Sequence, residues 1–384
     1  MGPLKGIRIV ELAGIGPGPM AAMLLADLGA TVLRVDRPVD AGLGIPRPLR
    51  YNLLLRNRQE MALDLKDPAG RELVLRLVQE ADGLIEGFRP GVTERMGLGP
   101  DACWARNPGL VYGRMTGWGQ QGPLAQSAGH DLNYIAVTGV LDLIGREGQP
   151  PTPPLNLLGD YAGGALYLAL GMLAALLEAR SSGTGQVVDA AIVDGTASLA
   201  TSFFGLSAAG LLQPGRGRNV LDSGAPFYDV YACADGLWVS VAPIEGKFFH
   251  DLLQRMGLDT QDLGAQNDRS HWPQLRAALA QRFKTRKRDE WCALLDGTDA
   301  CFAPVMSAQE APTHPHLQAR GTFVEVDGVV QPAAAPRFSR TAPPAPRAPQ
   351  ASSAESAMQA LRDWIGEDEA LQWQPLVSRC ARPG

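Results

Sequence analysis

Two side chains in the first half of the chain, His130 and Asp160, are of the types needed to move a proton. An imidazole titrates near neutral pH, and burial in apolar surroundings can raise the pKa of a carboxyl group. His130 follows a segment rich in glycine and glutamine, and Asp160 precedes an apolar run containing Gly163 and Gly164. Local sequence alone also suits two ordinary roles, a hydrogen-bonded structural histidine and a helix N-cap. Both interpretations stay open at this point.

Several basic side chains could hold phosphate groups. Arg89, within Gly-Phe-Arg-Pro-Gly, lies just past a predicted strand end, where open α/β sheets bind their ligands. The full set of candidates is Arg34, Arg37, Arg56, Arg58, Lys66 and Arg89. Each could equally be a solvated surface charge. The other histidines, His250, His271, His314 and His316, lie in surroundings typical of a surface or loop.

Composition and motif content argue against several classes of function. A net charge of -5 without a basic stripe gives no reason to expect nucleic-acid binding. The five cysteines are scattered and odd in number, which predicts no disulfide framework, no metal site and a reducing, cytoplasmic setting. The apolar run 161–177 contains glycines and is closed by Glu178 and Arg180, so we interpret it as a buried helix rather than a membrane span. The sequence has no P-loop, HExxH motif or serine nucleophile elbow, and its first residues lack a signal-peptide core.

The segment from Gly14 to Pro19, followed by a helix and a strand that ends at Asp36, is similar to a dinucleotide-binding fingerprint. Two prolines argue against that function. Pro17 and Pro19 lack the backbone N–H groups that a phosphate-binding turn must supply. Nicotinamide binding is therefore not favoured.

The elements that must position these residues alternate between strand and helix. Strands are predicted at 7–12, 31–35, 83–86, 110–116 and 185–191, and helices at 19–28 and 67–81, which indicates a parallel α/β sheet. We predict a large Rossmann-like domain over 1–190, a helical linker over 191–224 and a small α+β domain over 225–330 that opens with a hairpin. Residues 331–384 should form an extended connector and a helix, 354–365, that returns to the large domain.

A set of motifs over nearly the whole chain resembles one family. They are Val10–Pro19, Arg34–Pro38, Arg89–Arg95, Gly129–Tyr134, Asn156–Asp160, Gly224–Tyr228 and Thr298–Cys301. In combination they resemble the α-methylacyl-CoA racemases of the family III CoA-transferase superfamily. The resemblance implies an interlocked homodimer, with each active site between the large domain of one chain and the small domain of its partner.

The same resemblance implies roles for individual residues. His130 and Asp160 match the acid/base pair, and Glu245 matches the small-domain carboxylate that pairs with the histidine. The residues that match positions holding coenzyme A and the acyl thioester are Arg37, Met61, Ala62, Leu63, Asp64, Arg89, Ala128, Gly129, Asp131, Leu132, Asn133 and Tyr134. Gly246-Lys247 replaces the usual Pro-Gln after Glu245, and Ala242-Pro243 replaces the usual Gly-Ala before it, which puts the setting of Glu245 in question.

The implied reaction is racemisation of a 2-methylacyl-CoA thioester by 1,1-proton transfer through an enolate. Inverting the α-carbon needs one base on each face, with Glu245 orienting His130 and N–H groups after Asp160 stabilising the thioester oxygen. No metal or redox cofactor is required, since coenzyme A is part of the substrate. The alternatives are CoA transfer between carboxylic acids with Asp160 as nucleophile, and a non-catalytic protein that binds CoA thioesters.

Overall fold

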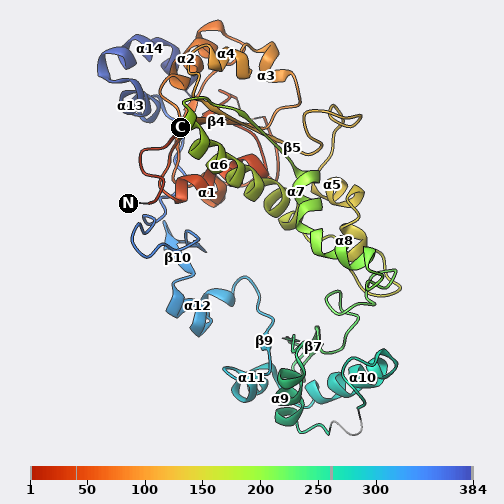
Figure 1. Cartoon of the computed structure of the whole chain (residues 1–384). Coiled ribbons are helices and arrows are strands. Elements are labelled where there is room, and N and C mark those ends of the chain that lie inside the picture. The colour runs from red at the N-terminus through yellow and green to blue at the C-terminus, as the bar shows by residue number, and fades with distance from the viewer. Residues whose placement is uncertain (1, 40, 260–262, 382–384) are drawn as a thin grey trace. The chain divides into compact units, whose positions relative to one another are not determined.

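The computed structural model describes residues 2–39, 41–259 and 263–381, and its internal contacts divide the chain into two compact units (Figure 1). The first unit consists of Met1–Thr138, Leu155–Leu199 and Arg320–Gly384, and the second of Gly139–Pro154 and Ala200–Ala319. The chain therefore enters the second unit twice. Residues 320–330, which we assigned to the small domain, belong to the first unit, and the predicted domain boundaries stay predictions.

The first unit is built on a six-stranded parallel sheet in the order β3-β2-β1-β4-β5-β6, which is the strand order of doubly wound nucleotide-binding folds. Its strands are β1 (Arg8–Leu12), β2 (Thr31–Asp36), β3 (Gln59–Ala62), β4 (Gly83–Glu86), β5 (Val111–Thr116) and β6 (Val187–Ala191). The predicted parallel α/β sheet is confirmed, with β3 as an additional strand. Strand order reverses between β1 and β4, so the loops after these two strands diverge at the carboxyl edge of the sheet.

Helices cover both faces of this sheet. Helices α1 and α6 share one apolar core with Ile9, Val32 and Ile85, whereas α2, α13 and α14 share another with Val10 and Leu33 (Figure 1). The helices of this unit are α1 (Pro17–Asp27), α2 (Pro68–Val78), α3 (Val92–Arg95), α4 (Pro100–Trp104), α5 (Asp131–Val137), α6 (Leu166–Ser182), α7 (Ile192–Leu199), α13 (Ala354–Ile365) and α14 (Glu367–Cys380).

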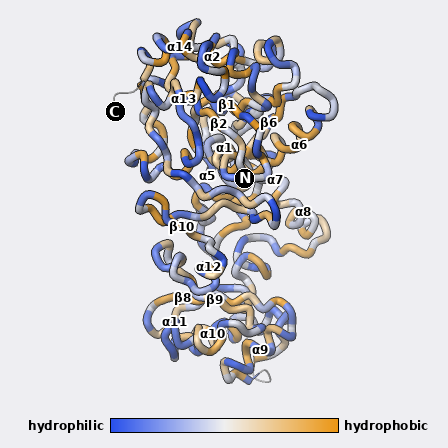
Figure 2. The backbone as a smooth tube through the Cα atoms, turned by 90° about the vertical axis from the view of Figure 1, so that its left-hand side faces the viewer, coloured by the Kyte–Doolittle hydropathy of each residue, from blue (hydrophilic) through white to orange (hydrophobic). Residues whose placement is uncertain are grey.

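Helix α6 continues directly from a π-helix, Leu157–Ala165, and ends where Gly183 adopts the left-handed conformation. Its residues are mainly apolar as far as Glu178 and Arg180. The backbone is coloured by hydropathy in Figure 2. By length and composition alone, the joined helix Leu157–Ser182 could cross a membrane, but Leu168 and Met172 are fully buried in the core beside the sheet. A core helix of a folded unit meets the same criterion.

Local signals explain where the flanking helices begin. Asp67 caps α2 by accepting the Ala69 N–H at 2.9 Å, and Ser353 caps α13 by accepting the Ser356 N–H at 3.0 Å. The helix predicted at 354–365 is present with those bounds, and Gly366 separates it from α14, which the sequence analysis did not identify. Before α13 the chain forms a short hairpin, β10 (Phe323–Val326) with β11 (Val329–Pro332), and then a segment without helix or strand up to Ser353.

The second unit has its own core around a three-stranded antiparallel sheet, β7-β8-β9. The predicted hairpin is present as β7 (Asp229–Ala232) and β8 (Trp238–Val241), and β9 (Phe302–Pro304) completes the sheet. Stacked and edge-on aromatic rings, among them Phe283 and Trp291 at 5.1 Å, fill the core beneath the helices. The helices in this part of the chain are α8 (Thr201–Ala208), α9 (Gly246–Met256), α10 (Trp272–Phe283), α11 (Arg288–Leu295) and α12 (Pro315–Arg320).

Candidate active site

Asp160 lies within the π-helix Leu157–Ala165 and not at a helix N-cap, so the N-cap interpretation is wrong. The Asn156 side chain donates a hydrogen bond to Asp160 Oδ2 at 3.2 Å. The backbone N–H of Asp160 donates to Asp131 Oδ1 at 2.6 Å. π-helical turns are rare and are concentrated at functional sites. Here the turn holds a carboxyl group at its surface while its own backbone is fastened to α5.

The loop after β1 lies directly against the Asp160 carboxyl group. Gly16, the residue before α1, has φ 68° and ψ -120°, a conformation that L-residues rarely adopt. A Cβ atom at Gly16 would lie 3.2 Å from Asp160 Oδ2. Glycine is therefore required here by both the backbone conformation and the close approach of the carboxylate.

His130 is exposed and lies immediately before α5, so the interpretation as a buried structural histidine is wrong. Its backbone N–H donates to the Asn133 side-chain oxygen at 3.1 Å, which fixes the start of the helix and leaves the ring outside the core. Its charge acts on the Asp160 carboxyl group. The structure thus brings His130 and Asp160 into one site.

Burial raises the pKa of Asp160 above its ordinary value of 3.8, and the negative charge of Asp131 acts in the same direction. The hydrogen bond from Asn156 and the charge of His130 oppose this rise. Asp131 is itself buried, and burial raises its pKa although the backbone N–H groups of Gly159 and Asp160 donate to it. Asp131 therefore supports Asp160 from below the surface of the site.

The N–H groups after Asp160 do not form the expected site for the thioester oxygen. The first of them, the Tyr161 N–H, donates to the Asn156 carbonyl oxygen at 3.3 Å within the helix. The N–H groups of Gly159 and Asp160 are occupied by Asp131. The expected oxyanion site is therefore not formed by these donors, because the π-helix and Asp131 already accept their hydrogen bonds.

Tyr134 holds the glycine-rich segment before His130 against α5. Its hydroxyl group donates to the Gly129 carbonyl oxygen, and its ring meets Trp118 edge-on at 4.8 Å. A Cβ atom at Gly117 would lie 2.0 Å from Tyr134 Cζ, so only glycine at position 117 lets the backbone approach the Tyr134 ring this closely. Burial and the charge of Asp160 raise the pKa of Tyr134, whereas Arg89 lowers it. Tyr134, Arg89 and Asp160 therefore belong to one electrostatic neighbourhood.

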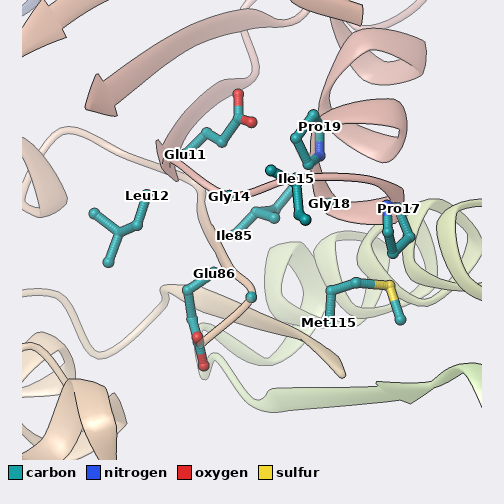
Figure 3. A pocket seen from close by; sticks show the side chains of 11 residues that line it. Glu11, Leu12, Gly14, Ile15, Pro17, Gly18, Pro19, Ile85, Glu86 and Met115 are labelled. Carbon is teal, nitrogen blue, oxygen red and sulfur yellow. The ribbon is translucent and has the colours of Figure 1, made fainter. Parts of the chain in front are cut away.

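A small cavity opens at the point where strand order reverses. It holds about 40 Å³, enough for two or three water molecules. Two buried carboxyl groups from neighbouring strands, Glu11 and Glu86, lie on its wall, with the loop between β1 and α1 beside them (Figure 3). The residues that line it are Glu11, Leu12, Gly14, Ile15, Pro17, Gly18, Pro19, Ile85, Glu86, Gly87 and Met115. Glu11, Gly16 and Glu86 were not predicted as site residues, although an acidic side chain at or next to the end of an apolar strand, as in Glu11 and Glu86, is a visible signal.

The predicted coenzyme A positions fall into three groups. Arg37, Asp64 and Arg89 are exposed and follow β2, β3 and β4, so they lie at the carboxyl edge of the sheet. In the segment around α5, Gly129 is half-buried and the exposed members are Ala128, Leu132 and Asn133. Met61, Ala62 and Leu63 are buried, as are Asp131 and Tyr134. Any contact from Met61, Ala62 or Leu63 must therefore come from the backbone.

Three of the basic candidates are occupied by internal ion pairs. Arg34 pairs with Glu60 at 2.6 Å, Arg56 pairs with Asp27 at 2.5 Å, and Arg58 pairs with Glu11. All three guanidinium groups are buried, which removes them as phosphate ligands. Arg37 and Arg89 are the exposed arginines of the set, and Lys66 is also exposed.

Glu245 lies in the second unit, where it is exposed at the residue before α9. It lies next to Cys301, whose thiol pKa is raised first by burial and then by the Glu245 charge. Lys247, one of the departures from the family pattern, follows on the first turn of α9 and lies 4.5 Å from the Phe248 ring centre. Within the described parts of the chain, no group of three or more His, Cys, Asp or Glu side chains could hold a metal ion.

Comparison with known proteins agrees with this architecture. The α-methylacyl-CoA racemases of Mus musculus and Homo sapiens are each 43% identical to the chain. The mouse alignment covers 96% of this chain and 95% of the relative, and the human alignment covers 88% and 87%. The crystal structure of a CAIB/BAIF family protein from Brucella suis superposes with a TM-score of 0.79 at 27% identity, over 98% of this chain and 99% of that one. The model of CoA-transferase family III matches residues 4–354, and the chain therefore belongs to CoA-transferase family III.

Proposed function

We propose that this protein is an isomerase that racemises 2-methylacyl-CoA thioesters at the α-carbon, with His130 and Asp160 as the opposed acid/base groups. The observation that carries the proposal is the pairing of an exposed imidazole with a partly buried carboxyl group whose pKa is raised. Enolate chemistry needs this pairing, because the two groups must exchange the roles of acid and base as the handedness of the substrate changes. The identity of the chain with racemases of mouse and man supports it.

Each proton transfer follows from the resting states of the two groups. When Asp160 is ionised it removes the α-proton from one face, and protonated His130 then delivers a proton to the other face of the planar enolate. The reverse reaction begins with neutral His130. Burial of Asp160 brings its proton affinity closer to that of the imidazole, so that both directions can run at the same pH.

The exposed guanidinium groups of Arg37 and Arg89 suit the phosphates of coenzyme A. Both follow parallel strands at the carboxyl edge, on the side of the sheet where such folds bind nucleotides. Guanidinium groups bind phosphate oxygens with two parallel hydrogen bonds, which gives direction as well as affinity. No cofactor beyond the coenzyme A of the substrate enters this mechanism.

We further propose that the active protein is a homodimer, in which Glu245 of one chain orients His130 of the other. Support comes from an exposed apolar stripe on α6, formed by Leu166 (51% exposed), Leu170 (64%) and Leu177 (70%). Exposed apolar side chains along one face of a helix are typical of a subunit interface. This arrangement requires neither nucleic acid nor a membrane, and it suits a cytoplasmic protein.

The decisive experiment is exchange of the α-proton in D2O with a panel of 2-methylacyl-CoA thioesters. We expect exchange with the unmodified protein, and its loss in Asp160→Asn and His130→Ala while both variants still bind coenzyme A. Glu72→Gln, which removes a surface ion pair with Arg106 at 2.9 Å, serves as a matched variant that keeps exchange. Trapping of an acyl-enzyme by hydroxylamine would instead indicate CoA transfer through Asp160. Binding without exchange or transfer would indicate a non-catalytic CoA-binding protein.

A further inference from the structure

Glu86, the last residue of β4, and Arg114, within the neighbouring strand β5, have no part in the proton transfer described above. They face each other in register on β4 and β5, and both side chains are almost completely buried. Arg114 Nε lies 3.6 Å from Glu86 Oε1, so the two groups form an ion pair that is too long for a hydrogen bond. Burying two charges costs desolvation energy, and further hydrogen bonds to the two side chains must offset that cost.

Each member of the pair fixes a different segment of the site. Glu86 Oε2 accepts the Phe88 N–H at 2.6 Å, which fixes the turn that presents Arg89. Arg114 Nη1 donates to the Gln120 side-chain oxygen at 2.8 Å, and Gln120 lies in the segment that leads to His130. The second amino group of Arg114 pairs with Glu94 on α3, at the far end of the Arg89 turn.

The two segments are also joined directly. The Gln126 side-chain amide donates to the Pro90 carbonyl oxygen at 3.1 Å, one residue beyond Arg89. The backbone N–H of Gln120 donates to Asp189 on β6 at 3.1 Å, so the base-bearing segment is attached to the sheet at both β5 and β6. The turn with Arg89 and the segment with His130 are therefore parts of one hydrogen-bonded assembly centred on Arg114.

We infer that Glu86 and Arg114 are positioning residues that hold the Arg89 turn and the His130 segment in a fixed relation at the carboxyl edge of the sheet. They couple the binding of the anionic end of an acyl-CoA by Arg89 to the position of the base His130. The inference rests on the proposed function for its catalytic half, whereas the binding half depends only on affinity for coenzyme A.

A pH dependence follows from the same geometry. Burial raises the pKa of Glu86 to about 7, with Glu94 and Asp189 acting in the same direction and the Phe88 N–H and Arg114 opposing them. Tyr112, whose ring lies 5.2 Å from the Arg114 guanidinium carbon, is a further titratable neighbour, and Glu11 lines the same small cavity as Glu86. Above this pH Glu86 is ionised, accepts a charge-assisted hydrogen bond from the Phe88 N–H and attracts the Arg114 guanidinium group. Below it, protonation weakens both interactions.

The test measures the dissociation constant of coenzyme A by calorimetry from pH 6 to pH 8.5, for the full-length protein and for Glu86→Gln. Replacing a charge-assisted bond by a neutral one corresponds to roughly a fivefold loss of affinity. We expect this loss at pH 8 and a smaller loss at pH 6, where Glu86 is already protonated. Phosphate groups of coenzyme A titrate equally in both proteins, so the difference between the two curves belongs to Glu86.

A second variant separates the two arms. Gln120→Ala cuts the link to the His130 segment and leaves Glu86 and Phe88 in place, so kcat for α-proton exchange should fall while the coenzyme A dissociation constant stays constant. Glu72→Gln, which removes a surface ion pair with Arg106 at 2.9 Å, is the matched control and should change neither quantity. The inference is overturned if Glu86→Gln binds coenzyme A equally or more tightly at pH 8, or if Gln120→Ala keeps full kcat. Absence of exchange in every protein, with the pH-dependent binding difference intact, would overturn the proposed function alone.

Discussion

Gly16→Ala tests whether the loop after β1 sets the position of the Asp160 carboxyl group. An L-residue held at φ 68° and ψ -120° costs about 1–3 kcal/mol of folding free energy. The new methyl carbon would lie 3.2 Å from Asp160 Oδ2, so the carboxylate must shift by a few tenths of an ångström. Errors of about 1 Å in reacting groups cost roughly 100-fold in rate, so we expect a loss of about tenfold in kcat with an intact coenzyme A affinity.

The assay combines thermal unfolding with α-proton exchange in D2O. At about 2–4 °C per kcal/mol, the melting temperature should fall by roughly 2–12 °C. Gly14→Ala is the matched control, since Gly14 lies in the same loop at an ordinary φ with open space around its Cα. Its stability should be unchanged or slightly increased. If Gly16→Ala matched Gly14→Ala in both melting temperature and kcat, the proposed contact between the loop and Asp160 would be refuted.

Three further outcomes follow from the site and its supports. Asp131→Ala should lower the free energy of unfolding by about 1–3 kcal/mol and remove most of the exchange activity, because two backbone N–H groups lose their acceptor. Asp131→Asn keeps an acceptor oxygen, so chemical denaturation and kcat measurements should show that much of both is retained. Proton removal by Asp160 should rise as pH increases through a pKa above 3.8, and a pH–rate profile with a midpoint at or below that value would contradict the burial argument. Asp67→Ala should lower the free energy of unfolding by about 1 kcal/mol, because α2 loses its cap, and should leave kcat unchanged. A fall in kcat would show that α2 influences the site.

The stability contribution of Glu86 has a sign that can be worked out separately. Its pKa rises from 4.5 to about 7 on folding, so the folded protein binds more protons than the unfolded chain between these values. The contribution is fully present below pH 4.5 and is lost as the pH rises through 7. Glu86→Gln lacks this dependence. Chemical denaturation should therefore show that the free energy of unfolding changes differently between pH 5 and pH 8 in the two proteins.

Sequence patterns predicted the parallel sheet and the helix Ala354–Ile365 because these elements carry strong local signals, apolar strands at regular spacing and a serine cap. They missed β3, whose four residues, Gln59–Ala62, include only two apolar side chains. The π-helix could not be foreseen, since an apolar run of this length has the same composition whether its hydrogen bonds span four or five residues.

The candidate site divides in the same way. The pairing of His130 with Asp160 was predicted only through the resemblance to a family, because local sequence suited both as structural residues; in the structure the charge of His130 acts on the Asp160 carboxyl group. Arg34 and Arg58 were misjudged as phosphate candidates since their partners, Glu60 and Glu11, come from other strands. Ion pairs across a sheet depend on tertiary neighbours that no local window contains.

The placement of α13 and α14 bears on how the protein is made in the cell. Their buried residues, such as Leu361 and Val377, share one core with Val10 on the first strand. The first unit therefore cannot close one face of its sheet until the last helices have emerged from the ribosome, whereas the second unit ends at Ala319 and can fold earlier. A nascent chain stalled before Ala354 would therefore leave this face of the sheet exposed to chaperones and proteases.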